Sequence, residues 1–148
     1  MEIVHRGTFR VVGIKYRGKN AKGEIPKLWE ERFFPRLGEI RQVVEAGVFY
    51  GVEGNYDPAT GNFDYLAGLE VDADAPVPHG MADWVVAEAD YAVFPTTLPE
   101  IRQTMDYIHR EWLPQSGYRH TGGPEFEYYG TDFMDGERMS VYVPVVRG

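Results

Sequence analysis

Val48-Phe49-Tyr50-Gly51-Val52-Glu53, residues 48–53, is the stretch on which the fold prediction rests. Its apolar and aromatic residues are typical of a β-strand. The triplet Phe49-Tyr50-Gly51 has a close counterpart, Tyr128-Tyr129-Gly130, in the second half of the chain. Each triplet stands at the same point in a series of strand and helix signals. A duplication of one structural unit is the simplest explanation.

The first half predicts a strand, a helix and two further strands. The strand runs from Thr8 to Tyr16, and Pro26 then suits the first turn of a helix. Residues at three- and four-residue spacing predict one apolar helix face: Trp29, Phe33, Leu37, Ile40 and Val44. Pro35 lacks an N–H and is expected to kink or split this helix. Strands are expected at 48–53 and 63–72.

The second half predicts the same order of elements. A single strand is expected from Trp84 to Phe94. Thr97 and Glu100 have the spacing of a capping box and predict the start of a helix. The apolar stripe of that helix is expected to hold Leu98, Ile101, Met105, Ile108 and Trp112. Two strands should follow, at 125–130 and 139–146.

These elements predict an α+β fold. We expect one domain over residues 1–148, with one repeat over about 1–74 and a second over about 81–148. Each repeat is a β-α-β-β unit, and the antiparallel sheets of the two repeats should be related by a pseudo-twofold axis. Pockets favour the interfaces between subdomains, so one interpretation is a ligand groove between the repeats; the other is a structural duplication without a pocket.

Composition excludes several classes of function. The chain has no cysteine, which excludes disulfides, thiolate metal sites and cysteine nucleophiles. Its net charge of -8 argues against direct binding of nucleic acid. No apolar run approaches the roughly 18 residues that span a bilayer, and the chain does not begin like a signal peptide, so a cytoplasmic protein is expected. The four histidines lack metal-ligand spacing, and no motif for a cofactor or a serine hydrolase occurs.

Glu127 is the most informative charged residue. Strand alternation puts Glu125, Glu127 and Tyr129 on one face, and Phe126 and Tyr128 on the other. Glu127 then points to solvent or into the groove. If the two aromatic triplets align, an apolar residue, Val48, occupies the matching position in the first half. A carboxylate among aromatic rings has a raised pKa and favours a cation as its partner.

Several segments resemble, in order, the GyrI-like small-molecule-binding family, which includes effector-binding domains of AraC-type and multidrug-responsive transcription regulators. The segments that carry the resemblance are Ile25-Pro26-Lys27-Leu28-Trp29, Tyr50-Gly51-Val52, Leu66-Ala67-Gly68-Leu69-Glu70-Val71, Pro78-His79-Gly80-Met81, Asp90-Tyr91-Ala92-Val93-Phe94, Glu111-Trp112-Leu113-Pro114-Gln115-Ser116-Gly117 and Phe126-Glu127-Tyr128-Tyr129. The resemblance implies two β-α-β-β repeats and a buried carboxylate at Glu127 that meets cationic drugs. No residues precede the domain to form a helix-turn-helix, so a direct transcription factor is not expected.

Strand parity, helix stripes and the resemblance together predict the lining of the groove: Glu127, Tyr129, Trp29, Trp112, Tyr91 and Tyr65, with Phe33 and Tyr50 as further candidates. The leading expectation is a stand-alone module that sequesters or senses lipophilic cationic or aromatic compounds, without metal or cofactor, and that passes the signal to a protein partner. The resemblance also implies two alternatives. One is a hydrolase of cyclopropane-bearing or other electrophilic compounds, in which Glu127 is the base or orients water. The other is a protein-binding inhibitor similar to the gyrase inhibitors of the family.

Overall fold

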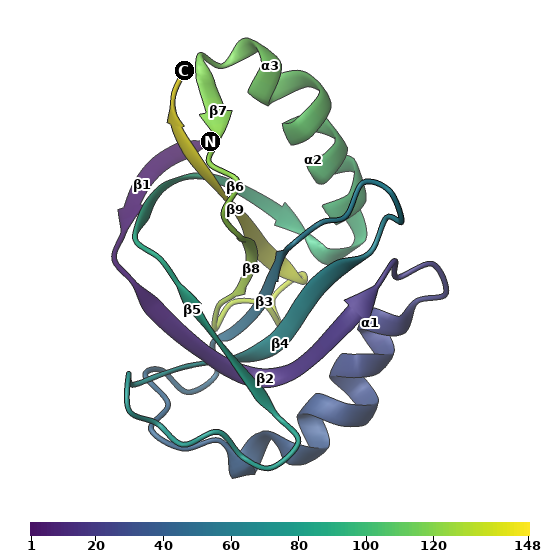
Figure 1. Ribbon diagram of the computed structural model, residues 1–148, viewed down its shortest axis with the longest axis vertical. Coiled ribbons are helices and arrows are strands. Elements are labelled where there is room, and N and C mark those ends of the chain that lie inside the picture. The colour runs from purple at the N-terminus through teal and green to yellow at the C-terminus, as the bar shows by residue number, and fades with distance from the viewer.

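The computed structural model describes residues 1–148 and has the predicted α+β fold (Figure 1). Nine strands form one sheet, and every pairing between them is antiparallel. The strands are β1 (Glu2–Arg6), β2 (Phe9–Gly18), β3 (Phe49–Gly54), β4 (Phe63–Val71), β5 (Ala82–Val86), β6 (Ala89–Thr97), β7 (Tyr118–His120), β8 (Glu125–Tyr129) and β9 (Arg138–Arg147). None of the helices is long and apolar enough to cross a membrane.

The strand order is symmetrical about its centre. It runs β1-β6-β9-β8-β3-β4-β2-β5, and β7 pairs with β9. The first half contributes β3-β4-β2 and the second half β8-β9-β6, and the two sets join through β3 and β8. The strand that opens each half crosses over, so that β1 pairs with β6 and β5 pairs with β2. This is the order expected of two repeats related by a pseudo-twofold axis.

The first helical segment follows β2 and changes its geometry twice. It begins as α1 (Glu24–Lys27), continues as a π-helical turn, η1 (Leu28–Phe33), and ends as a 3₁₀ segment, η2 (Phe34–Glu39). The last change occurs beside Pro35, as the sequence predicts, because proline cannot donate the hydrogen bond that a regular helix needs. Val44 lies beyond the end of the segment and is 54% exposed, so its assignment to the helix face was wrong.

The second helical segment follows β6. It consists of η3 (Leu98–Glu100), α2 (Ile101–Tyr107), the π-helical turn η4 (Ile108–Trp112) and α3 (Leu113–Gln115). It begins where the capping-box pattern predicts. The Thr97 hydroxyl nevertheless donates to the Glu100 carboxylate at 2.7 Å and caps no backbone N–H.

Both helical segments lie on the same face of the sheet. Ala67, Gly51, Glu127 and Val141 form one row of paired residues across β4, β3, β8 and β9, and directly paired residues share a face. Ala67 belongs to the apolar cluster under the first segment and Val141 to the cluster under the second. We call this side the helix face. The opposite face carries a third cluster: Phe9, Val11, Val48, Tyr50, Val52, Leu66, Val86, Tyr91, Val93 and Phe126.

Two features of the strands differ from the prediction. The stretch from Trp84 to Phe94 is not one strand, because β5 pairs with β2 whereas β6 pairs with β1 and β9. The chain must therefore leave one edge of the sheet at Ala87 and enter the other half. The short strands β1 and β7 were not predicted. Both pair with distant segments, and no local pattern specifies such pairing.

Candidate functional site

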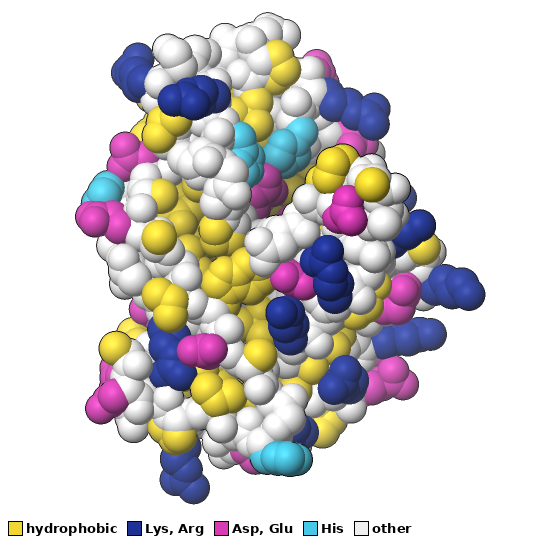
Figure 2. Space-filling model, viewed as in Figure 1, with side chains coloured by type: hydrophobic (Ala, Val, Ile, Leu, Met, Phe, Trp, Pro, Cys, Tyr) yellow, Lys and Arg dark blue, Asp and Glu magenta, His cyan; other side chains and the backbone are white.

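The centre of the helix face lies between the two helical segments. The first segment packs mainly on β2 and β4 and the second on β6 and β7, so the helices pack less on the middle strands β3 and β8. Figure 2 shows a recess on the molecular surface where histidine and acidic side chains gather above hydrophobic ones. We use the name central site for the helix-face side chains of β3 and β8 and their neighbours: Trp29, Glu53, Tyr65, Glu125, Glu127 and Tyr129.

Glu127 links the side chains of the central site by hydrogen bonds. Its Oε1 accepts hydrogen bonds from the Tyr65 hydroxyl at 2.7 Å and from the Tyr129 hydroxyl at 2.8 Å. Oε2 has no hydrogen-bond partner in the protein, and no cationic side chain forms an ion pair with this half-buried carboxylate. Burial raises the pKa of Glu127, the two tyrosine hydrogen bonds oppose that rise, and the charge of Glu125 adds to it.

Gly51 makes the contact between Tyr65 and Glu127 possible. It lies on β3, directly between its partners Ala67 on β4 and Glu127 on β8. A Cβ atom at this position would collide with the Tyr65 hydroxyl and with Glu127 Oε1. The missing side chain therefore lets Tyr65 reach across β3 to the carboxylate.

Trp29 supplies an aromatic wall beside Glu127. Its indole N–H donates a 3.0 Å hydrogen bond to the Tyr65 hydroxyl. The centroids of the Trp29 and Tyr129 rings are 5.7 Å apart, and the ring planes meet at 71°. Phe33 is fully buried, and the centroid of its ring lies 5.1 Å from that of Trp29. Phe33 therefore packs against Trp29 from the core side. Glu127 is thus joined by hydrogen bonds to two tyrosines whose rings or hydroxyls contact Trp29.

A second carboxylate, Glu125, is already neutralised. Its Oε2 lies 3.0 Å from His109 Nε2, on the second helical segment, and 2.9 Å from His120 Nε2, on β7. Burial disfavours the charged form of Glu125, but the two imidazoles outweigh it and lower its pKa to about 2. The same hydrogen bond raises the pKa of His109. This trio lies next to Glu53, which pairs with Glu125 across β3 and β8.

Glu53 is a third carboxylate that the sequence reasoning missed. It pairs with Glu125 on one side and with Tyr65 on the other, so it lies on the helix face. Burial, then the charges of Glu127 and Glu125, raise the pKa of Glu53 to about 8. Strand alternation from Gly51 could have indicated it, because residues two apart share a face.

The alignment of the two aromatic triplets was wrong. Tyr50 pairs directly with Tyr128, so Tyr50 and Tyr129 lie on opposite faces of the sheet. Val48 is buried in the cluster on the opposite face and is not the counterpart of Glu127. The residue across from Glu127 is Gly51, and the site holds three carboxylates instead of one.

Three of the predicted lining residues lie elsewhere. Tyr50 and Tyr91 belong to the cluster on the opposite face, where each packs against Phe126. Trp112 is on the helix face, but it lies over the second half of the sheet. The centroid of its ring is 5.0 Å from that of Phe94 and 6.1 Å from that of Tyr118. The structure therefore brings together Glu127, Tyr129, Trp29 and Tyr65, with Phe33 behind them.

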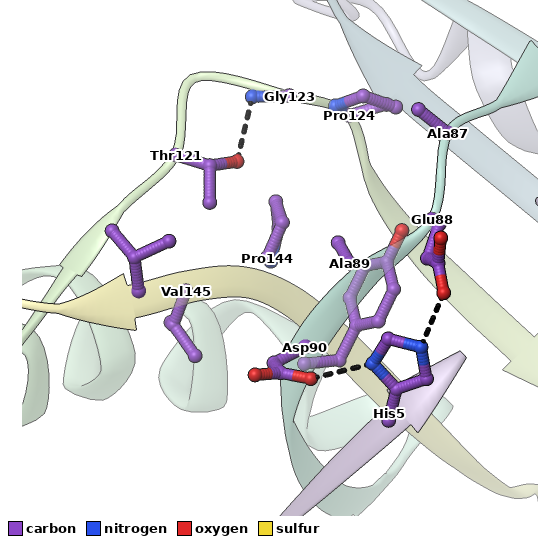
Figure 3. A pocket seen from close by; sticks show the side chains of 12 residues that line it. His5, Ala87, Glu88, Ala89, Asp90, Thr121, Gly123, Pro124, Pro144 and Val145 are labelled. Atoms are coloured by element: carbon purple, nitrogen blue, oxygen red, sulfur yellow. Dashed lines mark hydrogen bonds and ion pairs between the residues drawn. The ribbon is translucent and has the colours of Figure 1, made fainter. Parts of the chain in front are cut away.

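A separate pocket of about 370 Å³ opens near the start of β6 (Figure 3). Tyr91 lines it, whereas Glu127 does not. His5 at its rim is 2.7 Å from both Asp90 Oδ1 and Glu88 Oε2, and all three side chains are more than half exposed. Because these three side chains are exposed, water screens their charges, and the rim of this pocket attracts an ion only weakly.

Comparisons with known proteins identify the family of the chain and support its fold. A family model described as integron-associated effector binding protein matches residues 2–145. The transcriptional regulator BrlR of Pseudomonas aeruginosa is 36% identical over 149 residues, which cover 97% of this chain and 54% of BrlR. The chain therefore spans about half the length of this relative.

Two solved structures share the fold. SAV2435 bound to tetraphenylphosphonium has a TM-score of 0.73 and 17% identity, with 98% of this chain and 93% of that chain covered. The integron cassette protein VCH_CASS2 from the mobile metagenome of Vibrio cholerae has a TM-score of 0.67 and 20% identity, with coverages of 98% and 95%. At these identities the likeness concerns the fold alone.

Proposed function

The chain belongs to the integron-associated effector binding protein family, which confirms the GyrI-like resemblance, and we propose that its central site binds lipophilic cations and cationic aromatic compounds. Small-molecule binding is the property of the family; the preference for cations is our proposal. One observation carries it. The carboxylate of Glu127 is half-buried, has one oxygen without a partner and has no cation beside it. A cationic ligand would restore the charged form that burial disfavours.

The aromatic wall supports the same ligand class. The face of Trp or Tyr attracts a cation by ~0.5–2 kcal/mol, more when the pair is shielded from water. Trp29 and Tyr129 stand beside Glu127, so one ligand can touch a ring and the carboxylate together. Tetraphenylphosphonium, with which the structural neighbour SAV2435 was solved, combines a delocalised positive charge with four rings and is a suitable first probe.

Calorimetry with a charged and a neutral probe tests this function. Methyltriphenylphosphonium and triphenylphosphine oxide both carry three phenyl rings on phosphorus, but only the first has a net charge. We expect the cation to bind at least ~5-fold more tightly, which corresponds to about 1 kcal/mol. Equal affinities would contradict cation recognition. Absence of binding by both, and by a panel of cationic dyes, would contradict the small-molecule function of this site.

A hydrolase remains the second candidate. The raised pKa makes Glu127 a stronger base than an ordinary glutamate, and a carboxylate that accepts two hydroxyl hydrogen bonds can orient water. Mass analysis of an electrophilic cyclopropane after incubation separates the two functions. Unchanged compound with a rise in melting temperature supports a binding protein, and a mass gain of one water supports a hydrolase.

In this proposal the protein binds such compounds in order to sense them or to sequester them. BrlR is about twice as long as the part this chain matches, so its activity as a whole protein does not transfer. A protein partner that reads the bound state is part of the sensing proposal. For the gyrase-inhibitor alternative, the added protein would have to reduce supercoiling by purified gyrase.

A further inference from the structure

We propose that the central site prefers ligands with two cationic centres, one held by Glu127 and the second by Glu53. This inference rests on the proposed function and names the ligand class for that site. Its basis is the position of Glu53 and the absence of any partner for its carboxylate.

The two carboxylates lie on the same face at neighbouring positions. Gly51 pairs with Glu127 and Glu53 pairs with Glu125, so Glu53 is the diagonal neighbour of Glu127 across β3 and β8. Diagonal neighbours on antiparallel strands are about 7–8 Å apart, within reach of long side chains. A single small cation at Glu127 Oε2 does not fill this distance. An aromatic cation with a short charged arm does.

The three carboxylates of the site differ in how they are compensated. Glu125 has two imidazoles and Glu127 has two tyrosine hydroxyls. Glu53 accepts no hydrogen bond and joins no ion pair, and its side chain is only partly exposed to water. A partly buried carboxyl without a partner favours its protonated form in the empty protein, and a ligand cation beside it would favour the charged form.

Proton binding gives this arrangement a measurable signature. Burial, together with the charges of Glu127 and Glu125, raises the pKa of Glu53 to about 8, so the empty protein carries a proton there near neutral pH. Tyr129 and Tyr65 are the other titratable groups facing it, and both keep their protons because their own pKa values are raised, chiefly by burial. A cation placed over Glu53 should displace its proton into solvent.

Ethidium and propidium form a matched pair of probes. Both contain the same phenanthridinium ring, and propidium adds a quaternary ammonium on a propyl arm. We expect propidium to bind wild-type protein roughly 5- to 50-fold more tightly than ethidium, the range for a charged interaction at a partly buried group. Titration calorimetry at pH 7.5 in phosphate and in Tris, whose ionisation enthalpies differ, should show more proton release for propidium.

Glu53→Gln should reduce the ratio of the two affinities to near one and remove the extra proton release. Glu88→Gln is the matched control, because Glu88 is an exposed carboxylate in the separate pocket and should leave the ratio unchanged. It also corrects for the general attraction of a dication to an acidic protein of net charge -8.

Equal affinities for the two dyes in wild-type protein would overturn the inference, and so would a ratio that Glu53→Gln leaves intact. Neither outcome touches the proposed function, which is judged on ethidium and tetraphenylphosphonium binding and on its loss in Glu127→Gln. A circular dichroism melt of each variant verifies that the fold is kept.

Discussion

The hydroxyl of Tyr65 on β4 donates a 2.7 Å hydrogen bond to Glu127 on β8 and so crosses the whole width of β3, the strand between them. Only a glycine at position 51 leaves room for this contact. The bond fixes one carboxylate oxygen and leaves the other without a protein partner. The sheet thereby holds the anion in a defined orientation before any ligand arrives.

Replacing Glu127 by Gln should weaken tetraphenylphosphonium binding by roughly 5- to 150-fold, the loss of about 1–3 kcal/mol from a charged interaction. The neutral triphenylphosphine oxide should lose far less. Calorimetry on both proteins measures this. The empty variant should melt at an equal or higher temperature, because an amide costs less to bury than a carboxylate. Unchanged affinity for both probes would exclude the carboxylate from recognition.

Cation binding should also depend on pH through Glu127. Its pKa is raised by burial, so protonation begins at higher pH than for an ordinary glutamate. The affinity for tetraphenylphosphonium should fall as pH decreases through that raised pKa, because the protonated carboxyl has no charge to offer. Titrations from pH 8 to pH 4 measure the midpoint, and Glu127→Gln should give a flat profile over this range.

Tyr129→Phe tests the hydroxyl donors. The hydrogen bonds of Tyr129 and Tyr65 favour the charged form of Glu127. Loss of one donor should therefore raise the pKa of Glu127 further and move the pH midpoint of tetraphenylphosphonium binding upward. Affinity at pH 8 should change by only a few fold, since the ring is kept. A midpoint that stays in place would show that the hydroxyl does not stabilise the anion.

Gly51→Ala should disturb the site directly, because the added methyl group takes up the space of the Tyr65 hydroxyl and of the Glu127 carboxylate. Overpacking of this kind typically costs about 1–3 kcal/mol. Urea unfolding measures that loss, and weaker tetraphenylphosphonium binding should accompany it. Gly38→Ala is the control, because a Cβ at Gly38 meets no atom within 4 Å. Equal effects of the two substitutions would contradict the role given to Gly51.

The His109–Glu125 pair should set the pH range of maximal stability. The pKa of Glu125 is lowered to about 2, so its contribution is complete above the ordinary value of 4.5 and is lost as pH falls toward 2. The pKa of His109 is raised, so its contribution is complete below 6.5 and is lost as pH rises through the raised value. Glu125→Gln should cost about 1–3 kcal/mol at pH 6 by urea unfolding, and Glu30→Gln, at an exposed position, should cost almost nothing.

Glu53 should have the opposite effect on stability. Its folded-state pKa of about 8 exceeds the ordinary 4.5, so the folded protein binds the proton more tightly and loses stability as pH rises between these values. Glu53→Gln should flatten this decline and raise the free energy of unfolding at pH 9 by about 1–3 kcal/mol. Urea unfolding at pH 5, 7 and 9 measures it. A parallel decline in both proteins would contradict the buried state of Glu53.

Local patterns in the sequence predicted most of the elements and half of the site. Alternation along 125–130 put Glu127 and Tyr129 on the face opposite Phe126, and the structure agrees. The apolar stripe of the first helix correctly predicted that the Trp29 side chain faces the sheet. These predictions succeeded because side-chain direction within one strand or helix depends only on its own geometry. The same reasoning failed for Tyr50 and Tyr91, whose faces depend on register with distant strands.

The sequence by itself determined the α+β class, the order of most elements and the presence of a carboxylate among aromatic residues. Only the tertiary structure decided which of the carboxylates have a cationic partner and which have none. Pairing of β3 with β8 brings Glu53 beside Glu127, and β7 with the second helical segment brings two imidazoles to Glu125. Charge compensation depends on atoms a few ångströms apart in space, and long-range strand pairing sets those distances. The residue spacing within a single strand or helix does not predict these distances.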